Sequence, residues 1–573
     1  MVLGSDVKSA IRKYAIKNAM DYGKASEGAV MSKVISLFPG SKSDMGLLRS
    51  EVKSEVDKVN SMARNAIDEE YSAYSDEFKA AEATKAQKSA LHSFSIPGAE
   101  HGKFVTRFPP EPGGYLHIGH AKPIFIEDEL RKAYSGKLML YFDDTNPDNE
   151  RQEFVDSIKE DLAWLGLKFD SEYYASDAIP SLYQYASSVI GKGMAYVCTC
   201  NTLEVKKSRD SGIACSHKSQ DNATNLGLWE KMLNGGFGDN EAIVRLNSDL
   251  GSVNTTMRDP TLFRIKHSPH YRQGKKYHVW PTYDFCTPIM DSTNGITDVV
   301  RSKEYEMRDE LYFAVLDALG LRNPRITSFS RLEISNNATS KRKIRELIAS
   351  KQIAGYDDPR LVTIRALKRR GILPAAIREF ALSFGMGKSE SVVDISVLLN
   401  INRKMADKGA KRLFFIESPA EMHVKGLEGV KGISMRLHPS VDLGNRTYYA
   451  KSDVLIGSED AKGLRPGDVV RLKEAYNVRI DSISGSITAS YGGSENIEAK
   501  KISWVNKDGS VKCCLWDIGP LLSGDSFNEG SIIEKCGVAE GYASNLDEGD
   551  IVQFEKYGFY KLDSKAEMRF LSL

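Results

Sequence analysis

Residues 103–122 constrain the fold more than any other part of the chain, because strand, turn and helix signals follow one another there. The run Phe104–Phe108 has strand character, the segment Pro109–Gly114 is too rich in proline and glycine for regular structure, and Leu116 onward is typical of a helix. A strand that turns sharply into a helix points the helix N-terminus, with its free N–H groups and positive dipole end, above the sheet. This pattern predicts a phosphate-binding site for a nucleotide.

Two histidines begin the predicted helix. His117 and His120 are three residues apart, so they share one face of the first turn, and Gly119 between them leaves room for a flat base. An alternative is a proline-rich loop followed by a helix with incidental histidines. Arg107, the double proline and the double glycine in the same stretch favour the nucleotide site.

Length and composition set the broad class. A chain of 573 residues is too long for one core and indicates roughly three to five domains. The 78 basic and 77 acidic residues give a formal charge of +1, so global charge neither indicates nor excludes a nucleic-acid partner. No apolar run approaches the ~18 residues of a membrane span and no secretory signal pattern begins the chain, so we expect a cytoplasmic protein with no membrane partner.

The seven cysteines also favour a cytoplasmic location. Cys215, Cys286 and Cys536 lie far in sequence from any other cysteine, which fits a reducing compartment better than a disulfide scaffold. We interpret Cys286, Cys513, Cys514 and Cys536 as structural.

The first 95 residues are predicted to be a helical extension. Apolar residues recur there at helical spacing, as at Ile11, Ala15, Ile16 and Ala19, and the segment ends in the charged, alanine-rich run Asp76–Lys88. The pattern does not decide between a spacer bundle and a domain that docks RNA or a protein partner.

Residues 96–195 alternate between strand and helix patterns, which predicts a parallel sheet with crossover helices. We expect strands at Phe104–Phe108 and Lys137–Phe142, and helices at Ile118–Tyr134 and Glu150–Leu165.

Residues 196–272 lose this alternation and are rich in cysteine, glycine and polar turns, which indicates an insertion in the α/β domain. We expect the second half of that domain at residues 273–345. Its predicted elements are strands at Tyr277–Asp284 and Gly295–Arg301 and a long helix at Glu304–Leu319.

Residues 346–415 are predicted to form a helical, locally basic domain, and residues 416–573 one or two antiparallel barrels. Short strands separated by Gly, Asp and Asn turns carry the barrel prediction, for example Asp468–Leu472, Val478–Ile483 and Ile551–Phe554.

A second basic motif follows the last predicted strand of the sheet, Ala338-Thr-Ser-Lys-Arg-Lys343. We expect Lys341 on a flexible loop beside the Ser340 hydroxyl, where its charge neutralises a departing pyrophosphate. Basic loops are common, but this one and the histidine motif flank an interrupted α/β sheet.

These two motifs resemble the "HIGH" and "KMSKS" signatures of class I aminoacyl-tRNA synthetases, the second with only its Ser-Lys core. Three segments are similar to the glutamyl/glutaminyl branch: Arg-Phe-Pro-Pro-Glu-Pro-Gly-Gly-Tyr-Leu-His-Ile-Gly-His-Ala-Lys (107–122), Phe-Asp-Asp-Thr-Asn-Pro (142–147) and Trp-Pro-Thr-Tyr-Asp-Phe (280–285). The resemblance implies a Rossmann-like catalytic domain, an acceptor-stem insertion, a helical domain and anticodon-binding barrels. Barrels at the C-terminus are shared by glutaminyl and by archaeal or eukaryotic glutamyl members, and the helical extension fits the archaeal type.

Within this resemblance, one position indicates which amino acid is the substrate. Glutamyl members have arginine where Arg301 stands, and glutaminyl members have a small residue. A γ-carboxylate held by Arg301, Arg107 and the Tyr283 hydroxyl would form charge-assisted hydrogen bonds of about 1.5–3 kcal/mol each, and such a site can reject the neutral amide by roughly 10⁴-fold or more. The alternative is an ordinary salt-bridge arginine at a strand end. We expect Asp143 to bind the α-ammonium group and Asp144 to brace the turn.

The resemblance implies ATP-dependent ligation of L-glutamate to the 3′ end of tRNA-Glu through a glutamyl-adenylate. His117 and His120 would stabilise the phosphates, Lys341 would follow the pyrophosphate, and Mg²⁺ would arrive with ATP. The implied ATP site consists of Pro109, Glu111, Gly119, His117, His120, Ser340 and Lys341. The sequence leaves open whether tRNA-Gln is also charged. Members of the branch are commonly monomers and need bound tRNA before they activate the amino acid, and we expect the same here.

A metal site is predicted in the insertion. Cys198-x-Cys200 is followed after fourteen residues by Cys215-x-His217, and two tight pairs of soft ligands suit a tetrahedral structural Zn²⁺. Some relatives bind zinc at this place and others have lost it. The alternative is a set of ordinary cysteines.

Three rival functions differ from a glutamyl enzyme. Arg301 argues against a glutaminyl-tRNA synthetase, and the intact motif residues argue against a non-catalytic tRNA-binding protein on the same fold. A small-molecule nucleotidyltransferase would not explain the barrels. We expect RNA contacts from the insertion to the acceptor stem, from Arg365 and Arg369 to phosphates, and from the barrels to anticodon bases.

Overall fold

The computed structural model describes residues 5–22, 24–38, 44–63, 66–74, 78, 94–428 and 432–573. The chain divides into two compact units, Met1–Ser95 and Ile96–Leu573. Among the described residues, no helix combines the length and apolar character that crossing a membrane requires.

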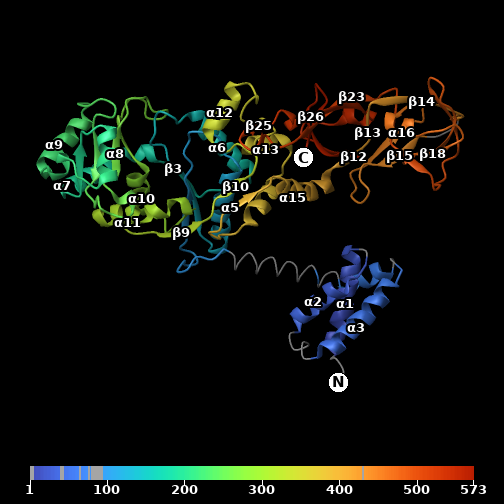
Figure 1. The fold of residues 1–573 in the computed structure, drawn as a ribbon, viewed down its shortest axis with the longest axis horizontal. Coiled ribbons are helices and arrows are strands. Elements are labelled where there is room, and N and C mark those ends of the chain that lie inside the picture. Colours follow the sequence, from blue (N-terminus) through green and yellow to red (C-terminus); the bar gives the residue numbers. More distant parts are fainter. Residues whose placement is uncertain are drawn as a thin grey trace. The chain divides into compact units, whose positions relative to one another are not determined.

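The described part of the first unit is helical, as predicted. Helices α1 (Ser5–Tyr22), α2 (Glu27–Leu37) and α3 (Met45–Asn60) lie side by side (Figure 1). Their shared core consists of small and branched apolar side chains, including Ile11, Ile16, Val34, Val52 and Val56. The predicted charged run Asp76–Lys88 lies outside the described residues, except for Phe78.

A parallel sheet forms the centre of the predicted α/β domain. Strands β1 (Val105–Phe108), β2 (Lys137–Phe142) and β3 (Ser171–Tyr174) pair in parallel, as do β8 (Asp298–Ser302) and β9 (Arg325–Phe329). The N–H of Thr297 donates to the carbonyl of Val105 at 2.9 Å, which brings β8 beside β1. The strand order is therefore β3-β2-β1-β8-β9, and the predicted α/β architecture is confirmed.

Helices α5 (Ile118–Ala133) and α6 (Gln152–Trp164) pack on this sheet, as expected from their apolar spacing. The helix predicted at Glu304–Leu319 is shorter: residues Lys303–Arg308 form a 3-10 turn and α11 spans Asp309–Leu319.

The insertion contains its own antiparallel sheet of β4 (Ala195–Cys198), β5 (Ile243–Leu246), β6 (Thr261–Ile265) and β7 (Val279–Pro281). Helices α7 (Ile179–Gly191), α8 (Thr202–Ser211) and α9 (Asn222–Leu233) accompany it. The prediction that the parallel sheet resumes at Tyr277–Asp284 is wrong. β7 pairs antiparallel with β6, and Tyr283 begins helix α10 (Tyr283–Thr293).

Helices connect this α/β domain to the barrels. The elements are β10 (Leu332–Ile334), α12 (Lys341–Ala349), α13 (Ile364–Arg370), α14 (Pro374–Leu382), β11 (Ser391–Val393) and α15 (Ser396–Ala406). Helix α14 packs on α5, so the helical domain extends the core around β1 and β2.

Two seven-stranded sheets follow, and each closes on itself. The first has the order β12 (Lys411–Leu413), β27 (Ile551–Phe554), β28 (Gly558–Ser564), β29 (Arg569–Ser572), β23 (Val511–Ile518), β26 (Ile532–Ala539) and β13 (Phe415–Glu417). Its outermost strands β12 and β13 are separated in sequence by Phe414 alone, so both edges belong to one continuous segment. A sheet with joined edges is a barrel.

The second barrel is built in the same way. Its order is β21 (Lys500–Ile502), β18 (Val469–Leu472), β19 (Asn477–Ser482), β20 (Ile487–Tyr491), β14 (Pro419–Lys425), β17 (Asp453–Gly457) and β22 (Trp504–Asn506). Only Ser503 separates its edge strands. The predicted barrels are confirmed and most of their strand pairs are antiparallel, but β12–β27 and β23–β29 in the first and β14–β20 and β18–β21 in the second are parallel. The first barrel begins at Lys411, slightly before residue 416.

One disulfide joins Cys514 of β23 to Cys536 of β26, which lie directly opposite each other. The cysteine pattern did not predict this pair, because the two residues come from strands that are not adjacent in sequence.

Candidate active site

A cavity of about 840 Å³ opens above the carboxyl ends of the parallel strands. Eight of the predicted site residues line it: Arg107, Pro109, Glu111, Gly119, His120, Asp143, Tyr283 and Arg301. A smaller cavity of about 220 Å³ is lined by the other predicted ATP-site residues, His117, Ser340 and Lys341, together with His120. His120 lines both cavities, so the structure brings together side chains from the two sequence motifs.

The two histidines are fixed by the start of α5. The backbone N–H of Gly119 donates to Nδ1 of His117, and the N–H of His117 donates to Nδ1 of His120, both at 3.1 Å. Because both Nδ1 atoms accept, each ring carries its proton on Nε2. Burial lowers the pKa of His117 to about 2 and that of His120 to about 4, with smaller contributions from His120 and Lys341 respectively. Both rings are therefore neutral hydrogen-bond donors.

The structure gives a different reason for glycine at position 119 from the one predicted. A Cβ atom at this position would lie 2.8 Å from Cε1 and 2.9 Å from Nδ1 of His117. The absent side chain thus leaves space for the His117 ring rather than for a base. Gly119 still lines the larger cavity through its backbone.

Lys341 begins a helix, so the prediction of a flexible-loop lysine is wrong. Ser340 caps α12 by accepting from the N–H of Lys343 at 3.2 Å, and the buried Ile344 and Leu347 hold the helix down. The segment from Ser340 to Lys343 was predicted as a loop because basic residues surround it, although the apolar residues Ile344 and Leu347 follow at helical spacing.

The Lys341 side chain reaches back to the turn after β1. Its Nζ lies 3.4 Å from Oε2 of Glu111, and both side chains are about half exposed. A Cβ atom on Gly114 would lie 3.0 Å from Cε of Lys341, and one on Gly113 would lie 3.1 Å from its Nζ. The double glycine therefore leaves a path for this lysine.

Arg107 is buried and already has a carboxylate partner. Its Nε donates to Oδ1 of Asp291 at 2.7 Å and its NH2 donates to Oδ2 at 3.0 Å. Its NH1 is buried without a hydrogen-bond partner among the described residues. Arg107 thus offers one free nitrogen, NH1, instead of a whole guanidinium.

Arg301 is in a similar state. Its NH1 donates to the Tyr283 hydroxyl at 3.2 Å, its NH2 pairs with Asp309, and its buried Nε has no partner among the described residues. Arg301 therefore lies beside Tyr283, the other residue predicted to hold the carboxylate, and it also forms the salt bridge of the alternative interpretation.

Asp143 contributes a buried hydrogen-bond acceptor to the large cavity. Its Oδ1 is buried and has no partner in the part of the chain that the structure describes. Burial, followed by the nearby Glu150, Asp144 and Glu111 carboxyls, raises the pKa of Asp143 to about 7. A bound cation would remove this penalty and favour the charged carboxylate.

Asp144 braces the turn, as predicted. It accepts from the N–H and the hydroxyl of Ser176, both at 2.8 Å, and from the hydroxyl of Tyr271 at 3.0 Å. Glu150, which sequence reasoning missed, lies beside it: burial and Asp144 raise the pKa of Glu150 to about 9. Its Oε2 is 3.3 Å from Nε2 of His270.

Asp291 was also missed, although a signal existed. It follows Tyr283 by eight residues, which is about two turns of helix, so both lie on one face of α10. The strand predicted at Tyr277–Asp284 concealed this relationship.

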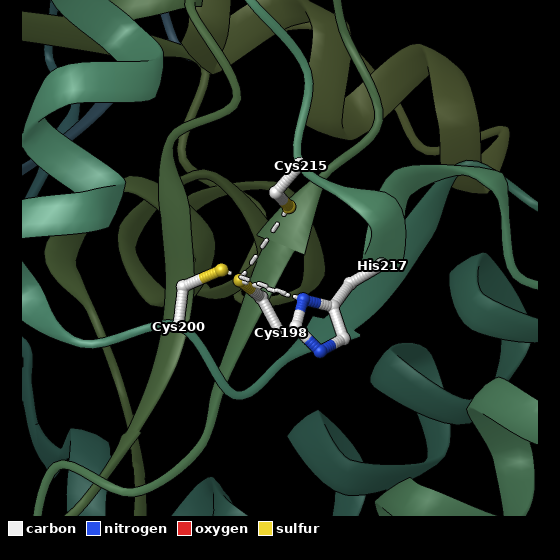
Figure 2. Close-up of side chains that lie close together, drawn as sticks. All are labelled: Cys198, Cys200, Cys215 and His217. Carbon is white, nitrogen blue, oxygen red and sulfur yellow. Dashed lines mark hydrogen bonds between the residues drawn. The ribbon is translucent and has the colours of Figure 1, made fainter.

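The four predicted metal ligands come together in the insertion (Figure 2). The Sγ of Cys198 lies 3.9 Å from the Sγ of Cys215 and 3.9 Å from Nδ1 of His217, and the Sγ of Cys200 lies 3.4 Å from the same Nδ1. The edges of a tetrahedron with zinc bond lengths are roughly 3.5–3.8 Å. Nε2 of His217 is 2.9 Å from the Thr199 hydroxyl, which leaves Nδ1 facing the sulfur atoms.

Two residues predicted to contact RNA phosphates have partners within the protein. Arg369 of α13 forms a bidentate salt bridge with Asp563 of β28: its Nε donates to Oδ1 and its NH2 to Oδ2, both at 2.9 Å. This pair connects the helix to the first barrel. The Arg365 guanidinium lies 5.1 Å from the centre of the Tyr115 ring.

Comparison with known proteins covers nearly the whole chain. The family model described as "tRNA synthetases class I (E and Q), catalytic domain" matches residues 103–406. Two models described as the anti-codon binding domain of the same family match residues 410–493 and 501–563, which contain most of the strands of the two barrels.

Archaeal relatives match over their full length. A protein named "Glutamate--tRNA ligase" from Nitrosopumilus maritimus is 36% identical, over 99% of this chain and 100% of its own. Proteins of the same name from Korarchaeum cryptofilum and Pyrococcus furiosus are 36% and 37% identical, with at least 97% of each chain covered. With these relatives and the matched catalytic and anti-codon binding domains, the chain belongs to the class I tRNA synthetases of the E and Q family.

Proposed function

We propose that this chain ligates L-glutamate to the 3′ end of tRNA-Glu in an ATP-dependent reaction, through a glutamyl-adenylate. One observation carries the choice of amino acid: the large cavity holds unpaired buried polar atoms of opposite kinds. Arg107 NH1 and Arg301 Nε are donors, and Asp143 Oδ1 is an acceptor.

Glutamate satisfies this set. Its γ-carboxylate accepts from the two guanidinium N–H groups, and its α-ammonium donates to Asp143. Unpaired buried donors cost free energy, so a ligand that pairs them is favoured over one that does not. The amide nitrogen of glutamine would face a donor and leave it unpaired, which disfavours glutamine. The names of the archaeal relatives support the same choice.

The chemistry needs no protein nucleophile. The glutamate α-carboxylate oxygen attacks the α-phosphorus of ATP and pyrophosphate leaves, and the terminal ribose hydroxyl of the tRNA then attacks the acyl carbon and AMP leaves. His117 and His120 donate from neutral Nε2–H groups to phosphate oxygens. Because these groups are held by the backbone, they need little reorganisation during the reaction.

Lys341 exchanges partners in this scheme. Its contact with Glu111 is long and half exposed, so it is worth little, and the phosphates of ATP carry more charge than one carboxylate. We infer that ATP draws Lys341 from Glu111 and that the lysine stays with the pyrophosphate as it leaves.

Magnesium belongs to the ATP complex in this proposal. Among the described residues, the groups of three or more metal-ligating side chains are the zinc-type cluster and the set Cys514, Glu534 and Cys536. Neither lines the large cavity. Mg²⁺ neutralises charge on the phosphates when ATP is bound.

The zinc cluster fits a structural ion. Three sulfur ligands and one imidazole nitrogen form a closed set, with no position left for a substrate. Cys198, Cys200, Cys215 and His217 would hold Zn²⁺ and fix the loop between β4 and α9, next to the sheet of the proposed acceptor-stem insertion.

A charging assay tests the function. Purified tRNA-Glu and tRNA-Gln are each supplied with ATP and labelled glutamate or glutamine. We expect glutamate on tRNA-Glu and no stable glutamine product. A higher rate with glutamine would overturn the amino-acid choice, and no product with either amino acid would favour a non-catalytic tRNA-binding protein. Glutamate on tRNA-Gln would extend the tRNA range without changing the chemistry.

A further inference from the structure

Glu127 is a buried acid in the large cavity that the reaction scheme above does not use. It lies on α5 two turns beyond His120, and His120, Pro123 and Glu127 line the cavity from one face of the helix. Its side chain is 1% exposed. Neither carboxyl oxygen has a hydrogen-bond partner among the described residues.

The charges around Glu127 do not provide it with a counter-ion. Arg107 of β1 is near, but two of its three nitrogens donate to Asp291 of α10. Asp128 and Glu129 on the same helix pair with Arg378 of α14, away from the cavity. A fully buried carboxylate without a hydrogen bond is costly, so the neutral acid is the favoured form.

The remaining titratable groups agree with a neutral Glu127. Tyr173 of β3, Tyr283 of α10 and Tyr312 of α11 lie close to the Arg107–Asp291 pair, and burial raises the pKa of each above its ordinary value. Arg301 of β8 and Arg331 before β10 line the cavity but pair with Asp309 and Glu304. Burial, opposed by Arg107 and reinforced by Asp291, raises the pKa of Glu127 well above its ordinary value.

A protonated carboxyl has one O–H donor. We propose that Glu127 is a specificity-determining residue that donates a hydrogen bond to the side-chain carboxylate of bound glutamate. The inference rests on the proposed function and deepens it. Glu127 would add a third donor to Arg107 NH1 and Arg301 Nε, which line the same cavity.

The proton on Glu127 then contributes to selectivity for glutamate over glutamine. A carboxylate ligand has two oxygens with about four acceptor positions, which can satisfy three donors. Glutamine has one carbonyl oxygen and an NH₂ group that would meet a donor. An ionised Glu127 would reverse this choice, because it would repel glutamate and accept from the glutamine amide.

Two substitutions separate the hydrogen-bond donor from the volume of the side chain. Glu127→Gln keeps a hydrogen-bond donor and a carbonyl acceptor, whereas Glu127→Met keeps the volume and has no donor. The control is Glu129→Gln, which removes a charge from the same helix outside the cavity. Aminoacylation with tRNA-Glu present gives kcat and the KM values for glutamate and ATP, and thermal unfolding compares folding.

We expect Glu127→Met to raise the KM for glutamate by about tenfold or more, with kcat and the KM for ATP within about threefold of wild type. Glu127→Gln should keep the KM for glutamate within about threefold. Because the amide retains the donor, Glu127→Gln should also retain the preference for glutamate over glutamine, whereas Glu127→Met should reduce it by about tenfold. Glu129→Gln should leave all of these values unchanged.

Three outcomes would overturn the inference. These are an unchanged KM for glutamate in Glu127→Met, an equal loss in Glu127→Gln and Glu127→Met, or a loss that affects glutamate and ATP alike. The last would mark a structural role. A wild-type chain that charges no glutamate would instead overturn the proposed function itself.

Discussion

The rings of His117 and His120 lie with their centroids 4.0 Å apart, and both Nδ1 atoms accept from the first backbone N–H groups of α5. The helix start therefore fixes both tautomers and leaves the proton of each ring on Nε2. The site has two preset neutral donors where a phosphate is expected.

Replacing His120 should slow the chemical step. His120→Ala removes one donor from the phosphate, and the loss of one such donor typically lowers kcat by about 10²-fold or more. We expect the KM for glutamate to change little, because the donors for its side chain lie elsewhere. Steady-state pyrophosphate exchange with tRNA present measures this, and an unchanged kcat would contradict the role.

Acid should destabilise the catalytic unit through these histidines. The folded pKa values of about 2 and 4 lie below the ordinary value near 6.5, so the folded state favours the neutral rings. Their contribution is fully present above about pH 6.5 and is lost as pH falls toward the folded values. We expect the wild-type unfolding temperature to fall between pH 6.5 and 4.5, and to fall less in His120→Asn. Equal slopes for both proteins would count against this.

Lys341 should act on the phosphates. Lys341→Ala is expected to lower kcat by about 10²-fold or more, because the departing pyrophosphate loses its mobile cation. Arg345→Ala, on the exposed face of the same helix, is the matched control and should retain activity. Glu111→Gln should cost no more than a few-fold, since it removes only the long contact seen here. Equal activity of Lys341→Ala and the control would refute the assignment.

Arg301→Ala should remove most of the selectivity for glutamate. The change deletes a buried donor and leaves Asp309 and Tyr283 without their partner. We expect kcat/KM for glutamate to fall by about 10³-fold, with a much smaller change for ATP binding. Competition between labelled glutamate and glutamine checks the direction, and a retained preference for glutamate would argue for a purely structural arginine.

The insertion should carry one zinc ion per chain. Mass spectrometry of the metal content should give about one Zn²⁺ for the wild type and none for Cys200→Ser, with a lower unfolding temperature after removal. Thr199→Val keeps all four ligands and should weaken binding by about 10–100-fold. Cys513→Ala, in a barrel, should leave the metal content unchanged. A metal-free wild-type protein that folds normally would exclude the site.

Residues close in sequence were predictable from the sequence, and partners distant in sequence were not. The spacing of His117 and His120 is enough to place both on one helical turn, and the Cys198–His217 spacing is enough to suggest a ligand cluster. Asp291 was hidden because the predicted strand Tyr277–Asp284 took in Tyr283, the first residue of its helix, and the short apolar run before Tyr283 fits either structure. Cys514 and Cys536 meet only through strand pairing, which depends on the register of the whole barrel.

The closure of the barrels has a consequence for the order in which they form during synthesis. All strands of the second barrel lie between β13 and β23 of the first, so they leave the ribosome as one continuous block. The first barrel needs β23 and the strands after it before its edges can join. The second barrel can therefore be completed before the first during synthesis. Strands β12 and β13 of the first barrel stay unpaired until their partners β27 and β26 have been made.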